Sequence, residues 1–266
     1  MRPYIIASFS GGKDSTAMVL RMLELGEQLD EVIFCDTYME FPEMYEHVRK
    51  VREVIEAHGV KFTELRNEKS FEYWMLDHKP KTRKPEYDVL GYGWATPMRR
   101  WCTKTMKTSI ISSYVKILRE THDVIQCIGL AADEGHRVER GHNQQPDMRH
   151  PLIEWGWIED QCLQYCYERG FDWGGLYNIY RRVSCWCCPL QRIGELRKLR
   201  AHHPELWQKM RYLESRSWNP IRPEASVEDL EVRFALEEEY LARGESITSR
   251  AFHRDWREKL SQEVRP

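Results

Sequence analysis

Short apolar runs alternate with longer amphipathic segments along the first 155 residues of this chain. The runs have the length and the β-branched and aromatic content of buried strands. The candidate strands are residues 4–9, 31–36, 61–65, 123–130 and 149–153. In the longer segments, apolar residues recur with the period of a helix. These candidate helices are residues 16–25, 41–58, 70–76 and 104–119.

Strands that alternate with helices predict an α/β fold: a doubly wound, Rossmann-like parallel sheet with helices on both faces. From residue 157 onward, strand patterns give way to helical ones. The candidate helices there are residues 195–200, 204–216, 227–242 and 249–261. We therefore expect a nucleotide-binding domain over residues 1–155 and a helical C-terminal region over 156–266.

The composition is that of a soluble protein with no general basic character. Hydrophobic residues make up 41% of the chain, charged residues 31%, and the net charge is −2, so general electrostatic binding to nucleic acid is not supported. No apolar run approaches the ~18 residues of a membrane helix. Residue 4 already begins a candidate core strand, which leaves no room for a secretory signal. We expect a cytoplasmic protein without a membrane partner.

A polar glycine turn joins the first candidate strand to the first candidate helix. It reads Ser10-Gly11-Gly12-Lys13-Asp14-Ser15. Glycines let the backbone approach a ligand closely, and a helix start offers unpaired N–H groups and positive dipole charge. Lys13 adds a charge, and Ser10 and Ser15 add hydroxyl donors. The turn predicts a phosphate site, although Ala7 and Asp14 exclude a Walker A loop.

This turn resembles the PP-loop of the adenine-nucleotide alpha-hydrolase (HUP) superfamily, which holds the pyrophosphate end of an adenine nucleotide. The segment Asp36-Thr37, followed by Glu40-Phe41-Pro42-Glu43, is similar to one in phosphoadenosine phosphosulfate (PAPS) reductase-like proteins. The resemblance covers about residues 4–190. Asp36, at a strand end, can accept a hydrogen bond from ribose or hold a magnesium-bound water, and the resemblance implies that Asp36 and Thr37 contact the nucleotide.

A third segment, from Gly129 to Arg137, follows a central candidate strand and resembles the family's glycine, acidic pair and arginine. It implies that Gly129 borders the nucleotide. The planar guanidinium of Arg137 can clamp a phosphate or sulfate. The candidate catalytic residues are therefore Lys13, Asp14 and Arg137, with Mg²⁺ as the accompanying cation.

Two groups of cysteines form the second candidate functional site, one suited to binding a metal. Cys102 follows a basic pair, and Cys185 and Cys188 form a Cys-x-x-Cys pair. Thiolates are the usual ligands of iron–sulfur clusters, and these three cysteines are our candidate ligands. A single zinc ion and a redox dithiol are the alternatives. Four other cysteines lie in apolar segments and are expected in the core: Cys35, Cys127, Cys162 and Cys166.

The pattern resembles adenylylsulfate reductases, in which a Cys-Cys doublet and a distant Cys-x-x-Cys hold a 4Fe-4S cluster. Here Trp101 replaces the first cysteine of the doublet. Three ligands leave one iron open, as in related PP-loop thiolation enzymes, unless Cys187 supplies the fourth. The reductases also carry a catalytic cysteine near the C-terminus, whereas this chain has none after Cys188.

Basic residues flank both cysteine groups, and residues 77–97 predict a long basic loop rich in proline and glycine. An anionic substrate is expected if the two groups meet: tRNA, DNA or a phosphorylated or sulfated metabolite. The tryptophans near the cysteines can stack on bases or fill the core. A second copy of the chain is a further candidate partner.

The resemblance implies an iron–sulfur-dependent PP-loop ATP pyrophosphatase that adenylates a substrate and transfers sulfur to it from a donor. One alternative is a reductase of adenylylsulfate (APS) or its 3′-phosphate (PAPS) that works with an external thiol. A second alternative is a nucleotide-binding or partner-binding module without catalysis. The acceptor of the sulfur and the choice between ATP and APS or PAPS stay open.

Overall fold

The computed structural model describes residues 2–81, 89–137 and 145–262. Its chain divides into two compact units, one of residues 1–71 and 101–186 and the other of residues 72–100 and 187–266. The predicted basic loop 77–97 falls partly outside the described residues. The division of the chain into domains at residue 155 stays a prediction.

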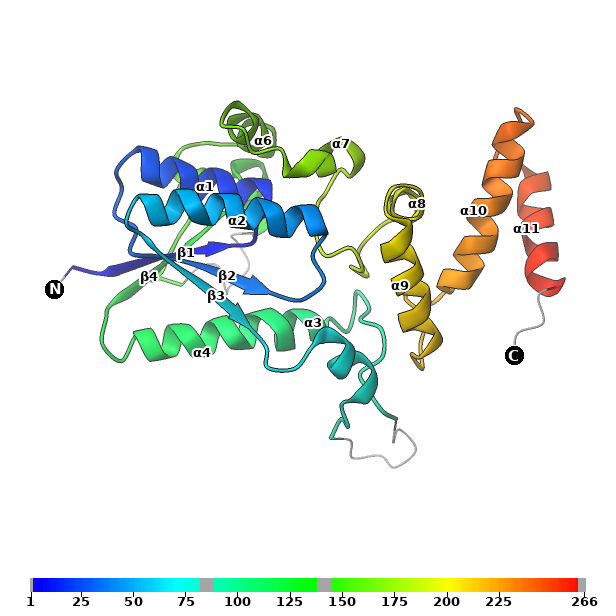
Figure 1. Cartoon of the computed structure of the whole chain (residues 1–266), viewed down its shortest axis with the longest axis horizontal. Coiled ribbons are helices and arrows are strands. Elements are labelled where there is room, and N and C mark those ends of the chain that lie inside the picture. Colours follow the sequence, from blue (N-terminus) through cyan, green and yellow to red (C-terminus); the bar gives the residue numbers. More distant parts are fainter. Residues whose placement is uncertain (1, 82–88, 138–144, 263–266) are drawn as a thin grey trace. The chain divides into compact units, whose positions relative to one another are not determined.

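A five-stranded parallel sheet forms the centre of the first unit (Figure 1). Its strands are β1 (Tyr4–Phe9), β2 (Glu31–Asp36), β3 (Lys61–Arg66), β4 (Val124–Ile128) and β5 (Met148–Arg149). They lie in the order β3-β2-β1-β4-β5. The chain therefore winds outward from β1 to β3, then crosses over β1 and continues on its other side. This confirms the predicted doubly wound α/β fold.

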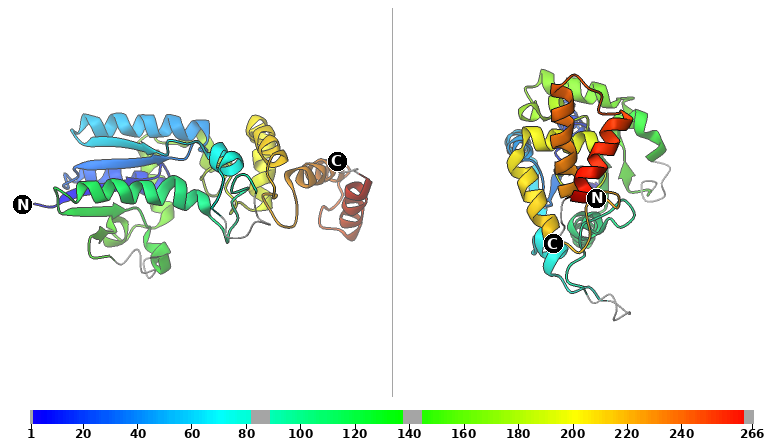
Figure 2. Two further views of the ribbon diagram at one scale, coloured as in Figure 1. Left: turned by 90° about the horizontal axis from the view of Figure 1, so that it is seen from below. Right: turned by 90° about the vertical axis from the view of Figure 1, so that its right-hand side faces the viewer.

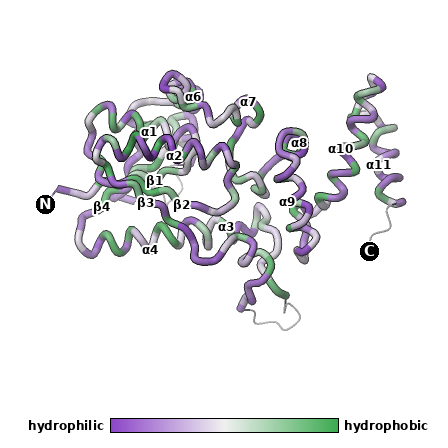
Figure 3. Tube along the Cα trace, in the orientation of Figure 1, coloured by the Kyte–Doolittle hydropathy of each residue, from purple (hydrophilic) through white to green (hydrophobic). Residues whose placement is uncertain are grey.

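Helices cover both faces of this sheet. α1 (Lys13–Glu24) and α2 (Pro42–Ala57) lie on one side and α4 (Ser109–Leu118) on the other (Figure 1). Ile6, Ile33 and Val124 point to one face, where they pack with Val115 of α4. Apolar and polar residues mix along each of these helices (Figure 3). The core thus lies between the sheet and the apolar stripes of its helices, as the sequence pattern predicts.

Shorter helices complete the first unit. They are α3 (Trp101–Thr103), α5 (Pro151–Glu154), α6 (Glu159–Glu168) and α7 (Leu176–Ile179). The candidate helix over 104–119 begins as a π-helical turn, Lys104–Thr108, before α4. The candidate helix over 70–76 overlaps a further π-helical turn, Tyr73–Asp77, which lies in the second unit.

The predicted strand over residues 149–153 is largely wrong. The ladder with β4 ends at Arg149, and Pro151 begins α5. Proline has no N–H to give to a strand ladder, whereas its fixed φ suits the first position of a helix. The apolar residues Leu152 and Ile153 therefore belong to a helix and not to a strand.

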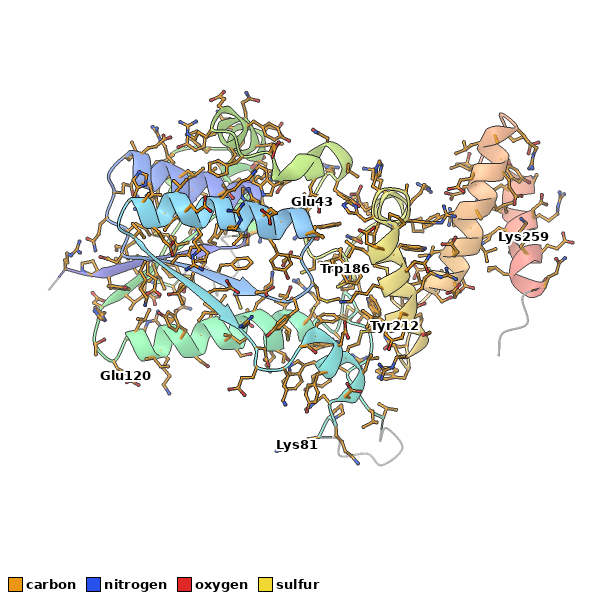
Figure 4. The ribbon with its side chains drawn as sticks, viewed as in Figure 1. Glu43, Lys81, Glu120, Trp186, Tyr212 and Lys259 are labelled. Carbon is orange, nitrogen blue, oxygen red and sulfur yellow. The ribbon has the colours of Figure 1, made fainter. Side chains whose placement is uncertain are left out.

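The second unit is helical. Its long helices are α8 (Ile193–His202), α9 (Pro204–Ser215), α10 (Val227–Ala242) and α11 (Arg250–Gln262), close to the predicted ranges. α10 and α11 lie side by side and pack through Tyr240 and Phe252 (Figure 2). Tyr212 of α9 and Lys259 of α11 lie on the surface of this unit (Figure 4). Within the described ranges, no helix has the length and apolar character needed to cross a bilayer.

A buried carboxylate stabilises the end of the sheet away from the strands' carboxyl ends. Glu31 is fully buried, and its oxygens accept hydrogen bonds from Tyr114 (2.6 Å), Tyr4 (3.2 Å) and Thr63, with Lys61 Nζ 3.1 Å away. Burial raises the pKa of Glu31, but the hydrogen bonds from Thr63 and Tyr114 outweigh it and hold this pKa below its usual value. The charged form is therefore the one that the fold stabilises.

We expect Glu31→Gln to lower the free energy of unfolding by about 1–3 kcal/mol at neutral pH, because an amide cannot accept all of these hydrogen bonds. Urea unfolding measures the loss. Since the pKa of Glu31 is lower in the folded protein, the difference between the proteins should shrink as the pH falls through that pKa. The exposed Glu53→Gln on α2 should change stability by less than about 0.5 kcal/mol. Equal losses for both variants would contradict this role.

Candidate functional site

The glycine turn lies at the carboxyl end of β1. At two positions here, Gly11 in the turn and Gly129 after β4, there is no room for a larger residue. Gly11 has a φ of +80°, and a Cβ there would lie 2.5 Å from Met44 Sδ on α2. A Cβ on Gly129, just after β4, would lie 2.9 Å from the Cα of Ser15. Gly12, by contrast, has an ordinary φ of −72°. The turn, α2 and the end of β4 are therefore packed closely together.

Gly129→Ala tests this close approach. We expect it to destabilise the protein by about 1–3 kcal/mol, because the new methyl group meets the backbone of α1, which cannot rotate away. It should also weaken ATP binding, since Ser15 belongs to the turn. Thermal unfolding and titration with ATP measure the two effects. Gly135→Ala is the matched control, because a Cβ there meets nothing within 4 Å. A Gly129→Ala protein that behaves like this control would contradict the packing argument.

Serine hydroxyls hold the turn in shape. Ser15 Oγ accepts a hydrogen bond from the backbone N–H of Ser10 (3.1 Å) and donates one to the carbonyl of Gly12 (3.0 Å). Ser10 Oγ lies 3.1 Å from Ser15 Oγ. Both predicted phosphate-binding serines thus also organise the loop.

Two aromatic residues, Trp173 just before α7 and Tyr177 on α7, brace the same turn, and sequence reasoning missed their role. Trp173 Nε1 donates a hydrogen bond to the carbonyl of Gly11 (2.7 Å), and Tyr177 accepts one from the N–H of Lys13 (3.0 Å). Trp173 stacks on His47, whose burial lowers its pKa to about 3. No local pattern marks these residues, because they lie more than 160 positions from the turn.

Lys13 is buried and already has two carboxylate partners. Its Nζ lies 3.2 Å from both oxygens of Asp14 and 2.5 Å from Glu159 Oε2, at the first residue of α6. Burial lowers the pKa of Lys13, but Asp14 and Glu159 outweigh it and raise this pKa overall. Burial raises the pKa of Asp14, although Lys13 opposes the change. Sequence reasoning did not single out Glu159.

Asp36 ends β2 and is almost completely buried. Its Oδ1 accepts hydrogen bonds from the backbone N–H of Tyr38 and from the hydroxyl of Tyr45, both at 2.8 Å. Burial, reinforced by the bond to Asp36, raises the pKa of Tyr45, so its hydroxyl stays a donor. These bonds fix the orientation of the Asp36 carboxylate at the strand end. Its predicted contact with ribose or Mg²⁺ stays a prediction.

Thr37 directly follows β2, and its side chain lies beside Cys185. Its hydroxyl donates to Glu40 Oε1 (3.2 Å) and lies 3.4 Å from Cys185 Sγ. The structure therefore directs this side chain towards a cysteine, and its predicted role in nucleotide binding stays untested. Glu43, near the start of α2 (Figure 4), lies close to Gly174: a Cβ on Gly174 would lie 3.0 Å from Glu43 Cγ.

Arg137 lies in the helical turn Ala132–Arg137 that follows β4. Its guanidinium donates to both carboxylate oxygens of Glu134, at 2.6 and 2.7 Å. The preceding Asp133 accepts a hydrogen bond from the backbone N–H of Glu159 (3.2 Å). In the acidic pair predicted for this segment, Glu134 thus orients the Arg137 guanidinium, and Asp133 positions the start of α6.

Burial separates the cysteines into two groups that match the predicted ones. Three are partly exposed, namely Cys102, Cys185 and Cys188, and the other five are buried. The four cysteines predicted to lie in the core do so, and burial raises the pKa of Cys35 to about 11 and of Cys127 to about 12. Their thiols stay protonated at neutral pH. Cys187, the alternative fourth ligand, is 3% exposed.

A charged pair formed by the buried Glu40 and the partly exposed Lys107 lies beside Cys185. Its Sγ donates to Glu40 Oε1 (3.3 Å), and Lys107 Nζ lies 3.4 Å from the same oxygen. Burial lowers the pKa of Lys107, but Cys185 and Glu40 outweigh it and raise this pKa overall. The π-helical turn Lys104–Thr108, five residues long, carries Lys107 on the segment that follows Cys102. Such turns often occur at functional sites.

The three candidate ligand cysteines are divided between the two units. Cys102 and Cys185 belong to the first unit and Cys188 to the second. In residues 2–81, 89–137 and 145–262, no three His, Cys, Asp or Glu side chains are arranged to hold a metal ion. The donor chemistry nevertheless fits an iron–sulfur cluster, because the three partly exposed thiols are the three predicted ligands.

The nearby tryptophans are mostly core residues. Trp94, Trp101, Trp173 and Trp186 are each less than 8% exposed, which supports the structural interpretation of these rings over base stacking. Trp155 and Trp157 are partly exposed and contact each other at 5.9 Å between ring centroids.

A family model described as "Phosphoadenosine phosphosulfate reductase domain" matches residues 4–191. Uncharacterized protein MJ0066 of Methanocaldococcus jannaschii is 28% identical over 221 residues, which are 77% of this chain and 40% of that protein. Uncharacterized protein MJ0973 of the same organism is 24% identical over 220 residues, which are 77% of this chain and 46% of that protein. The chain thus spans less than half the length of these relatives.

Among solved structures, the chain is similar to the U34-tRNA thiolase NcsA from Methanococcus maripaludis with its [4Fe-4S] cluster. The match has a TM-score of 0.41 and 15% identity, and it covers 80% of this chain and 67% of that one. A likeness of this size carries no conclusion about activity.

Proposed function

We propose that this chain is an ATP pyrophosphatase that activates a substrate for sulfur transfer. The chain belongs to the phosphoadenosine phosphosulfate reductase family of the PP-loop superfamily. It binds ATP at the turn Ser10–Ser15 and transfers the adenylyl group to a substrate oxygen. Sulfur then replaces that oxygen. The acceptor is an anionic molecule, with tRNA and DNA as the leading classes.

The observation that carries the nucleotide half of the proposal is the place of the turn in the sheet. The strand order reverses at β1, with β2 and β3 on one side and β4 and β5 on the other. In open parallel sheets, ligands bind beyond the carboxyl ends of the strands at this point of reversal. The turn follows β1 and Gly129 follows β4, so both lie at this point. They are in close contact, because a Cβ on Gly129 would lie 2.9 Å from the Cα of Ser15.

The roles of the individual residues follow from their chemistry. The backbone of Gly11 and Gly12 and the hydroxyls of Ser10 and Ser15 hold phosphate oxygens at the positive end of α1. Lys13 neutralises the pyrophosphate as it leaves. The remaining contacts are assigned to Asp14 and Asp36 for Mg²⁺ or ribose, Thr37 and Gly129 for the nucleotide, and Arg137 for an anion.

The bond changes of activation are those of adenylyl transfer. A substrate oxygen attacks the α-phosphorus of ATP, the bond to the β-phosphate oxygen breaks, and pyrophosphate leaves with that electron pair. The oxygen of the substrate is now joined to AMP, which is a good leaving group when sulfur attacks the substrate. Electrostatic stabilisation of the departing pyrophosphate is the main contribution of the turn.

Cys102, Cys185 and Cys188 are the residues that would hold a 4Fe-4S cluster. When bound, such a cluster supplies an iron position, not occupied by a cysteine, at which sulfur can be carried. Lys107 supplies a positive charge beside the Cys185 sulfur, and Glu40 holds this lysine in place. A lysine near a thiolate favours its deprotonated, metal-binding form.

Purification without oxygen, followed by iron and acid-labile sulfide analysis and a pyrophosphate-release assay with ATP, tests the proposal. We expect a brown protein that releases pyrophosphate when a nucleic-acid acceptor is added. A colourless protein with one zinc ion and no labile sulfide would refute the cluster. Sulfite release from APS or PAPS with a thiol would identify a reductase. Nucleotide binding without pyrophosphate release would identify a module without catalysis.

A further inference from the structure

The cation proposed for the phosphates is already neutralised in this structure. Lys13 Nζ contacts Glu159 Oε2 at 2.5 Å and both oxygens of Asp14 at 3.2 Å. The Lys13 side chain is only 11% exposed, so it has little contact with water. An ammonium group has three N–H donors. A phosphate at the turn therefore has to take over donors that a carboxylate now uses.

The two carboxylates differ in how easily they can give way. Asp14 is the next residue on α1, and its side chain is 22% exposed. Glu159 comes from α6, which packs beside α1 (Figure 1), and its side chain is 41% exposed. The backbone N–H of Glu159 is held separately by Asp133. The Glu159 carboxylate can thus turn into water while its helix stays in place.

We propose that Glu159 is a built-in counter-ion that holds Lys13 in the nucleotide-free protein and is displaced from it by a phosphate group of the nucleotide. The proposal rests on the proposed nucleotide site and adds a residue that sets its affinity. A carboxylate and a phosphate left on the same side of Lys13 would repel each other, so Glu159 leaves as the phosphate arrives. Part of the binding energy of the nucleotide is used to break this ion pair.

The direction of the expected effect distinguishes a counter-ion from a binding residue. Glu159→Gln keeps the shape of the side chain and removes its charge, so the phosphate no longer competes with a carboxylate. We expect the Kd for ATP and for inorganic pyrophosphate to fall about three- to fivefold, as for a partly exposed ion pair. Isothermal titration measures both constants. Asp160→Asn, at the next and exposed position of α6, removes the same charge and should leave both constants unchanged.

A second measurement reports the reactivity of the Lys13 amine in protein to which no nucleotide has been added. Its rate of acetylation by acetic anhydride, read by mass spectrometry of the peptide that contains it, reports how freely the amine is available. We expect faster acetylation in Glu159→Gln than in the wild type or Asp160→Asn. Added pyrophosphate should protect Lys13 in all three proteins.

The outcomes separate this proposal from the function on which it rests. Tighter ATP binding together with faster acetylation of Lys13 in Glu159→Gln supports the counter-ion. Unchanged or weaker binding in that variant overturns it and leaves the nucleotide site intact. Tighter binding with unchanged acetylation overturns it as well, because Glu159 would then only repel phosphate through space. A folded wild type that binds neither ATP nor pyrophosphate refutes the nucleotide site itself, and the counter-ion with it.

Discussion

Lys13→Met is expected to reduce pyrophosphate release from ATP by about 10²- to 10³-fold, the effect of losing one preorganised charge at a developing anion. Methionine keeps most of the aliphatic length of lysine, so the packing of the buried side chain changes little. The loss should fall mainly on kcat, because the charge on pyrophosphate grows as the bond to the α-phosphorus breaks. Steady-state kinetics with ATP and a saturating acceptor measure it.

The change also leaves Asp14 and Glu159 without their shared cation, so a loss of folding has to be distinguished from a loss of catalysis. Circular dichroism and thermal unfolding of Lys13→Met provide this distinction. Lys116→Met, on the exposed surface of α4, removes the same charge away from the turn and should keep full activity. A folded Lys13→Met protein with activity within twofold of the wild type would remove this lysine from the mechanism.

Cys185→Ser is expected to reduce the iron and acid-labile sulfide content of anaerobically purified protein to background. The three partly exposed cysteines are the predicted ligands, so the loss of one leaves too few thiolates for a cluster. Serine occupies nearly the same space, and its hydroxyl can still bond to Glu40. The fold of the surrounding segment should therefore persist. Iron and sulfide analysis, with unfolding curves as the check on folding, measures the effect.

Cys127→Ala is the matched control, because its thiol is buried on β4 and its pKa is raised to about 12 by burial. It should keep the full iron content. Cys187→Ser addresses the remaining alternative: unchanged iron content leaves three cysteine ligands, and a loss makes Cys187 the fourth. Full iron content in Cys185→Ser would refute the predicted ligand set.

Sequence patterns predicted the parallel sheet and most helix positions because these depend on residues near one another in the chain. The run from β1 through the glycine turn to α1 is a local motif, so its phosphate chemistry could be inferred directly. The prediction failed at residues 149–153, where Pro151 begins a helix although the apolar run suggested a strand. There, the backbone chemistry of one residue outweighed the pattern.

The residues that complete the candidate site were not predictable in this way. Tyr177 and Trp173 brace the turn, and Glu159 neutralises Lys13, from more than 140 positions away. Glu40 lies in a segment that resembles the family, but its contact with Cys185 depends on residues that are distant in sequence. Such contacts arise only when α6, α7 and the segments on either side of α7 pack beside the turn and β2.

Local residue order was enough to predict the strand–turn–helix that offers N–H groups and a lysine to phosphate. It was also enough to distinguish the three candidate ligand cysteines from those of the core. Local spacing and burial periodicity are sufficient for both. The contact between Lys13 and Glu159 and the charges around Cys185, in contrast, depend on tertiary packing. Electrostatic interactions depend on distances in space, and these are set by the packing of helices and strands that are far apart in the chain.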